Sequence, residues 1–278
     1  VKGIYTNSKR YVDKLPENDN DFNRQGGVQI YNAAGELEWV GGLQEGKRVG
    51  TDLLFLYVQE YIYRDQAAVD AHASREDVLL PNRFSRYPGD VAWRDVNGDD
   101  VINSNDRVVS GRTTPDFTGG FSTNLNYKGL SLFVRTNFAF GHKIYNNAFG
   151  KGLAQTQGNL NQPTALLDTW TPDNRDTDLP RFIFVDAQRN IARGVGNGSG
   201  STRFWEKGDY LALAEVSLSY DVPTKFFNDK ISSLRFFVSG NNLHYFKSFT
   251  GDTPELGGSQ QGEFPISKTY TLGLNVTF

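Results

Sequence analysis

Apolar and polar residues alternate with a period of two over several long stretches, and this pattern constrains the fold more than any other feature. In the clearest stretch, 268–278, Tyr270, Leu272, Leu274, Val276 and Phe278 alternate with threonine, glycine and asparagine. Such alternation predicts strands with one apolar and one polar face. The same period runs through 121–127, 130–140 and 210–220, where Tyr210, Ala212, Ala214, Val216, Leu218 and Tyr220 are expected on one face. Residues 232–246 and 53–63 are also predicted strands, the second with a weaker polar face.

The polar faces carry arginine, glutamate and asparagine, which suits the wet interior of a membrane barrel or the outer surface of a soluble sheet. The lengths of the connections decide between the two. Short connections at 128–129 and 222–231 alternate with long ones at 64–115, 141–208 and 247–265. Short periplasmic turns and long external loops are typical of outer-membrane barrels. We therefore predict an all-β, transmembrane antiparallel β-barrel with Phe278 at the periplasmic end.

Charge and composition exclude several classes of function. The 29 basic and 32 acidic residues give a net charge of −3, which does not favour nucleic acid as a partner. No apolar run approaches the ~18 residues of a membrane-spanning helix. Cysteine is absent, and the three histidines lie on separate segments without the spacing of a metal centre. We expect no catalytic site and no enzyme activity.

One segment has the spacing of a metal-binding loop. Numbered as a twelve-residue calcium loop, 95–106 offers side-chain oxygens at positions 1, 3, 5, 9 and 12 and a backbone carbonyl at position 7. The predicted Ca²⁺ ligands are Asp95, Asn97, Asp99, Val101, Asn103 and Asp106. Asp100 stands where such loops usually have glycine, and Asp106 replaces the usual glutamate. The alternative is a solvated turn rich in asparagine and aspartate.

Motifs in a fixed order connect the chain with a known family. They are EGKRVG (45–50), QAAVDAH (66–72), PGDVAWRDVNGDDVINSND (88–106), WTPDN (170–174) with LPR (179–181), EKGDYL (206–211), VSGNNLHYF (238–246), DTPE (252–255) and the terminal YTLGLNVTF (270–278). In this order the chain resembles the C-terminal part of a SusC/RagA-type TonB-dependent outer-membrane transporter of Bacteroidetes. The first forty residues match this family poorly.

The resemblance implies a particular assembly and activity. In this family a 22-stranded barrel encloses an N-terminal plug and contacts TonB through a segment further upstream. A SusD-like surface lipoprotein covers the barrel as a lid, and the pair imports oligosaccharides or peptides across the outer membrane. We accordingly expect 53–278 to supply C-terminal barrel strands embedded in outer-membrane lipid, and 1–52 a hairpin or strand region of the barrel. Val1 is then expected to be an internal position of a longer chain or a processed end.

Two alternatives stay open from the residues alone. One is a soluble, secreted, calcium-binding β-domain for glycan binding or adhesion, whose apolar face would be a sandwich core. The other is a self-contained eight-stranded barrel, which would need two more strands from 1–52. A candidate hairpin at 28–31 and 37–40 could supply them. The residues that bind the transported substrate are not identifiable from the sequence.

Overall fold

The computed structural model describes residues 1–154, 161–183, 187–191, 200–223, 225, 231–256 and 266–278. Its main element is a six-stranded antiparallel sheet in the order β1-β10-β11-β14-β15-β16. The strands are β1 (Lys2–Thr6), β10 (Phe117–Tyr127), β11 (Leu130–Phe140), β14 (Tyr210–Asp221), β15 (Ser233–Lys247) and β16 (Thr269–Thr277). Within the described residues the sheet is open, with β1 and β16 as its edges and no closed barrel.

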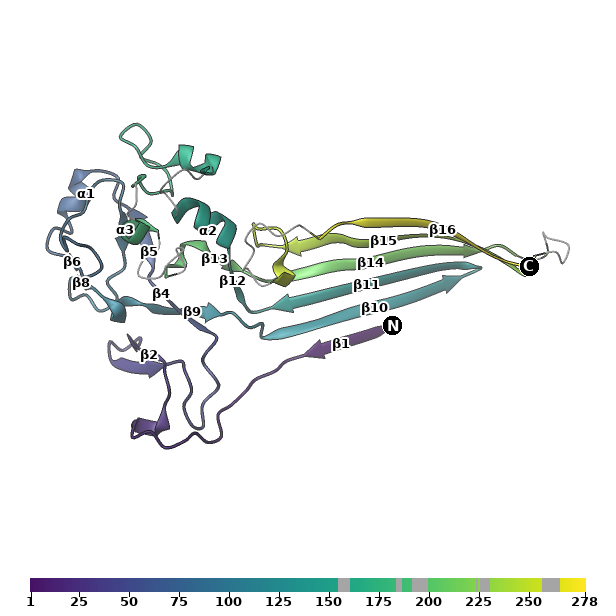
Figure 1. Ribbon diagram of the computed structural model, residues 1–278, viewed down its shortest axis with the longest axis horizontal. Coiled ribbons are helices and arrows are strands. Elements are labelled where there is room, and N and C mark those ends of the chain that lie inside the picture. Colours follow the sequence, from purple (N-terminus) through teal and green to yellow (C-terminus); the bar gives the residue numbers. More distant parts are fainter. Residues whose placement is uncertain (155–160, 184–186, 192–199, 224, 226–230, 257–265) are drawn as a thin grey trace.

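Short and long connections lie at opposite ends of this sheet (Figure 1). Lys128 and Gly129 join β10 to β11 with φ angles of 46° and 84°. A two-residue turn with positive φ at both positions matches the twist of paired strands, and glycine adopts it without steric cost. The C-terminus lies at this short-turn end (Figure 1). The described parts of the long connections lie at the other end, where they form a region of small elements (Figure 1).

This small-element region contains five two-stranded sheets and three short helices among the described residues. The strands are β2 (Val28–Tyr31), β3 (Leu37–Val40), β4 (Leu53–Leu56), β5 (Gln59–Ile62), β6 (Glu76–Asp77), β7 (Val91–Trp93), β8 (Val101–Ile102), β9 (Val108–Arg112), β12 (Lys143–Tyr145) and β13 (Trp205–Lys207). The helices are α1 (Gln66–Asp70), α2 (Asn147–Ala154) and α3 (Ala187–Asn190), and short 3-10 turns lie at 21–23, 104–106, 164–168, 202–204 and 254–256. None of the helices in the described part of the chain is long and apolar enough to cross a membrane.

The buried apolar core lies in this region. Three small clusters form it: Tyr57, Val91, Trp93 and Ile102; Tyr63, Val69 and Ala92; and Leu153, Ile191 and Phe204. The long sheet, by contrast, buries few of its large apolar side chains. The core therefore stabilises the folded connections, and the sheet extends beyond it.

The structure differs from the expectation for 53–63. This segment is two short strands, of which β4 pairs with β9 and β5 with β7, and neither joins the long sheet. The physical reason is that 53–58 is apolar on both faces, so Leu56 and Tyr57 are buried in the small-element region. The predicted 28–31/37–40 hairpin forms as β2 and β3 but also stays outside the sheet. From 1–52 only β1 joins the long sheet, which has six strands among the described residues, two fewer than a self-contained eight-stranded barrel needs.

Candidate functional site

The strand register places most large apolar side chains of the long sheet on one face. Leu132, for example, lies opposite Leu125 of β10 and Leu218 of β14, and Val238 lies opposite Leu218 and Leu272. Many of these side chains are exposed: Tyr5, Phe117, Phe121, Leu125, Tyr127, Leu130, Phe140, Leu211, Leu218, Tyr220, Phe236, Val238, Phe246, Tyr270, Leu272, Leu274 and Val276. Soluble monomers rarely leave a contiguous apolar surface of this extent uncovered. We call it the apolar face.

A bulge in β14 changes which of its residues belong to that face. The register passes from Arg135–Glu215 to Thr136–Leu213, so Ala214 has no partner on β11. An extra residue reverses the side-chain alternation beyond it. Leu211 and Leu213 therefore lie on the apolar face, whereas Tyr210 and Ala212 lie on the other one. The expectation that Tyr210 and Ala212 share a face with Val216 is wrong.

The opposite face of the sheet is polar, and we call it the polar face. Arg135 Nη2 lies 3.2 Å from Glu215 Oε2 across β11 and β14. Near the short-turn end Arg235 makes two hydrogen bonds to Asp221, of 2.6 and 2.9 Å. Phe237 is an apolar exception on this face and lies over Gly273, where a Cβ atom would meet its ring. This face suits contact with water and solutes, as the inner wall of a barrel does.

At the long-connection end, a buried carboxylate ties two connections together. Asp90 is 2% exposed and accepts hydrogen bonds from Arg181 Nε at 2.6 Å, Asn190 Nδ2 at 3.1 Å and Arg189 Nη1 at 3.3 Å. Tyr87 contributes its backbone N–H, and both guanidinium groups lie over its ring. Asp90 thus joins the 64–115 connection to the 141–208 connection. The sequence showed Asp90 only as part of the PGD motif, because a partner about ninety residues away leaves no local signal.

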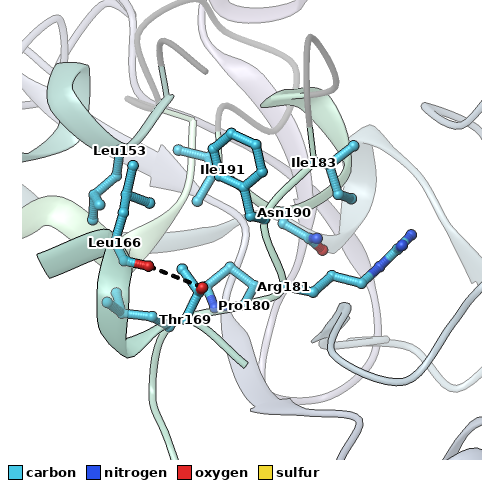
Figure 2. A pocket seen from close by; sticks show the side chains of 10 residues that line it. Leu153, Leu166, Thr169, Pro180, Arg181, Ile183, Asn190 and Ile191 are labelled. Atoms are coloured by element: carbon cyan, nitrogen blue, oxygen red, sulfur yellow. Dashed lines mark hydrogen bonds between the residues drawn. The ribbon is translucent and has the colours of Figure 1, made fainter. Parts of the chain in front are cut away.

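Next to this network lies a small cavity (Figure 2). Leu153, Leu166, Leu179 and Ile191 line it together with Arg181 and Asn190, and Thr169 Oγ1 donates a 3.0 Å hydrogen bond to Leu166 O at its rim. Its volume of about 20 Å³ has room for roughly one water molecule. Sites for small-molecule ligands are usually ten or more times larger. The cavity is therefore a packing gap rather than a substrate site.

The structure brings the predicted calcium ligands into one compact loop. Asp95 accepts 2.8 Å hydrogen bonds from the backbone N–H groups of Gly98 and Asp100, and Asp99 accepts one from Val101. Asn97 Nδ2 donates to Asp99 at 2.8 Å. Asp100, where glycine is usual, has a φ of 59° and makes the sharp turn in the left-handed region.

Asp106 is the last residue of this loop, and its side chain is buried. It is 1% exposed and accepts backbone hydrogen bonds from Val96 at 2.9 Å and Asn103 at 2.7 Å. Burial raises the pKa of Asp106, Asp95 and Asp99 raise it further, and the two backbone hydrogen bonds oppose the shift. Among the described residues no three acidic or histidine side chains are grouped closely enough to hold a metal ion. Ca²⁺ binding through Asn97, Asn103 and the Val101 carbonyl as well stays a prediction.

The three histidines lie in unrelated surroundings. His72 Nδ1 is 3.1 Å from Tyr63 Oη and 3.3 Å from Tyr61 Oη. Burial lowers the pKa of His72, and the positive charges of Arg75 and Arg86 lower it further. His142 is buried beside Gly208, and His244 stacks edge-on against Phe246 of the same strand. In the part of the chain that the structure describes, they form no common site.

Known proteins that are similar to the chain point to one class. No family model matches the chain. It is 27% identical to TonB-dependent receptor P3 of Formosa agariphila over an alignment of 290 positions, which covers 99% of the chain and 26% of that protein. TonB-dependent receptor P26 of the same organism is 28% identical over 229 positions, which cover 78% of the chain and 21% of that protein. The chain is homologous to TonB-dependent receptors.

The homology extends over nearly the whole chain, which spans about a quarter of the length of these relatives. Solved structures share the fold. The RagAB peptide transporter matches 99% of the chain with a TM-score of 0.63 at 22% identity, and the RagAB peptide importer in the "closed-closed" state matches 88% with a TM-score of 0.57 at 23% identity. The chain covers 26% and 24% of those two chains. TonB-dependent receptors are outer-membrane transporters and not enzymes. The prediction that the chain is not an enzyme is confirmed by this homology.

Proposed function

We propose that this chain is a C-terminal barrel-wall segment of a SusC/RagA-type transporter in the outer membrane. The observation that carries the proposal is the two-faced sheet, with exposed apolar side chains on one side and charged and amide side chains on the other. In a 22-stranded barrel the apolar face contacts lipid and the polar face lines the lumen. Homology to TonB-dependent receptors supports the same assignment.

The soluble alternative, a secreted calcium-binding β-domain, fits these observations less well. A soluble antiparallel sheet packs its apolar face onto a core. Here the buried clusters lie in the small-element region, and Leu272 on the apolar face is 84% exposed. In water this surface would favour aggregation, whereas lipid would stabilise it.

In the proposed mechanism the chain is a conduit. A SusD-like lipoprotein lid captures an oligosaccharide or peptide over the long-connection end. TonB, acting through a segment upstream of this chain, then displaces the plug so that the substrate passes along the polar face. RagAB, whose fold the chain shares, is a peptide transporter, and this favours a peptide as one of the two substrate classes. The folded connections joined by Asp90 would form the wall of the entrance on the external side.

Charged substitutions on neighbouring positions of β15 test the proposal. Val238 is on the apolar face and Ser239 on the polar face, where its partners are Ser217 and Thr271. Arginine facing lipid near the bilayer midplane costs about 2–4 kcal/mol, whereas substitutions facing the lumen cost little. In lipid vesicles, Val238→Arg in the complete transporter should lower the free energy of unfolding by about this amount. Ser239→Arg is the matched control. Equal effects of the two changes would contradict a lipid-facing apolar face.

The proposed partner has a separate test. Gentle detergent extraction of the complete transporter from its native membrane should co-purify a SusD-like lipoprotein in a fixed ratio. Recovery of the transporter without any lipoprotein, under conditions that keep it folded, would contradict the proposed lid.

A further inference from the structure

A row of charged and small side chains crosses the polar face of the long sheet. Lys2 of β1 lies opposite Ser122 of β10, Ser122 opposite Arg135 of β11, and Arg135 opposite Glu215 of β14. Directly opposite residues in an antiparallel sheet project from the same face. The row therefore places one cationic side chain on each side of the small Ser122.

A hollow lies over this row. Its volume is about 330 Å³, and Lys2, Ile4, Gly120, Ser122, Arg135 and Asn137 are among the residues that line it. Two of the residues that line it, Gly120 and Ser122, are small. A Cβ atom at Gly120 would lie 2.9 Å from Thr136 O and 3.2 Å from Asn137 Oδ1. The volume lies within the range of sites that hold small ligands.

The charges around the hollow do not cancel. Arg135 has a carboxylate partner, because its Nη2 lies 3.2 Å from Glu215 Oε2. Among the ion pairs of the described residues none includes Lys2. Two cations and one anion leave one net positive charge. The Asn137 amide and the Ser122 hydroxyl add neutral hydrogen-bond donors.

We propose that this hollow is a binding subsite for a carboxylate group of the transported substrate. Lys2 and Arg135 would supply charge-assisted hydrogen bonds, and Ser122 and Asn137 would orient the carboxylate. The chemistry fits the acidic side chains of a peptide and the uronic acids of an oligosaccharide equally. The inference rests on the proposed function in one respect, since the polar face must line the lumen for the substrate to reach the hollow.

The test fills the hollow with a carboxylate of the protein itself. Ser122→Glu places an acid opposite both Lys2 and Arg135, an arrangement that favours folding because opposite charges in register stabilise paired strands. Asn124→Glu is the matched control, because it adds the same charge to the same face two residues further along β10, outside the hollow. The complete transporter, purified in detergent, is titrated with hexaglutamate and with hexagalacturonate. Hexaglycine and maltohexaose serve as uncharged counterparts.

The wild-type protein should bind at least one acidic probe more tightly than its uncharged counterpart, and added salt should weaken that binding. Ser122→Glu should weaken it about tenfold or more, the loss expected for a blocked charge-assisted contact, while Asn124→Glu changes it less than about twofold. The acidic probe that binds shows whether the carboxylate comes from a peptide or from an oligosaccharide. The proposal is overturned if neither acidic probe is preferred, if Ser122→Glu binds as the wild type does, or if both variants lose affinity equally.

These outcomes are independent of the barrel-wall assignment. Binding is measured on the purified protein, so it does not depend on import. The Val238→Arg and Ser239→Arg comparison in lipid tests the proposed function without the hollow. Failure of one experiment therefore does not produce failure of the other.

Discussion

Asp90 shows at the scale of single residues how connections far apart in the sequence hold one arrangement. Its carboxylate is almost fully buried and binds two guanidinium groups and one amide. A buried charge is tolerated when it is paired and its remaining lone pairs accept hydrogen bonds. The network therefore fixes the relative positions of the segments around Asp90, Arg181 and Arg189.

Removal of the Asp90 carboxylate should destabilise this region strongly. Asp90→Ala leaves Arg181 and Arg189 without their shared anion, and breaking a buried pair in this way costs about 3–5 kcal/mol. Hydrogen exchange in 85–93 should speed up accordingly. Asp176→Ala is the control, because Asp176 pairs with Arg64 at 2.8 Å but is 88% exposed, and such surface pairs contribute less than about 1 kcal/mol. Equal effects of both substitutions would contradict a structural role for burial here.

His72 should make the surroundings of α1 sensitive to acid. Its folded-state pKa lies below the unfolded value because of burial and of Arg75 and Arg86, which outweigh Glu60 and Asp100. A lowered histidine pKa contributes stability that is present above the unfolded pKa of about 6.5 and is lost as the pH falls through the folded pKa. Hydrogen exchange of 66–72, corrected for intrinsic rates, should therefore accelerate below about pH 6.5.

Substitutions of two different histidines show whether His72 causes this effect. His72→Gln should remove the pH dependence of exchange in 66–72. His244→Gln should leave it unchanged, because that ring stacks on Phe246 in the long sheet. A wild-type pH dependence in His72→Gln would assign the effect to another group.

At the scale of elements, the β12–β13 strand pair contains an unfavourable charge pair. Lys143 and Lys207 lie directly opposite each other. Like charges in this position destabilise a strand pair, and opposite charges contribute about 0.2–1 kcal/mol. Lys207→Glu should therefore raise the protection of β12 amides from exchange, whereas Lys9→Glu, an equal change of charge at an exposed position, should not. Lower protection in Lys207→Glu would show that the pair is not repulsive.

The 95–106 loop carries the prediction of Ca²⁺ binding. Added Ca²⁺ should slow proteolysis of this loop, and a chelator should reverse the effect. Protection should weaken as the pH falls, because calcium binds ionised carboxylates and the pKa of Asp106 is raised. Asp95→Asn combined with Asp99→Asn should abolish it, and Asp176→Asn should not. Proteolysis that is identical with and without Ca²⁺ would support the solvated turn instead.

Elements with a long, regular alternation were predictable from sequence, and those decided by distant partners were not. The residues of β11 and β16 show the period of two over nine or more positions, so their faces follow from the sequence. By contrast, β1 has five residues, one of them Gly3, too few for a period to stand out. The bulge at Ala214 leaves no local signal either, because it is defined by the register with β11.

At the scale of the whole molecule, the small-element region and the long sheet differ in how much of their apolar surface they bury. The small-element region has its own buried clusters and hydrogen-bond networks, whereas the described part of the long sheet leaves most of its large apolar side chains exposed. A sheet without a packed face needs an apolar surrounding or further protein to be stable. In our account lipid supplies this surrounding for the apolar face, and the substrate path runs along the polar face.

A spin-label scan along β11 tests this account most directly. The chain has no cysteine of its own, so single cysteines at successive positions from 130 to 140 label cleanly within it. In lipid vesicles, oxygen should reach labels at Leu130, Leu132, Val134, Thr136, Phe138 and Phe140 best, and a water-soluble nickel complex should reach the labels between them. Alternation of the two reagents with a period of two is the predicted result. Equal access of the nickel complex to both sets of positions would contradict a membrane-facing sheet.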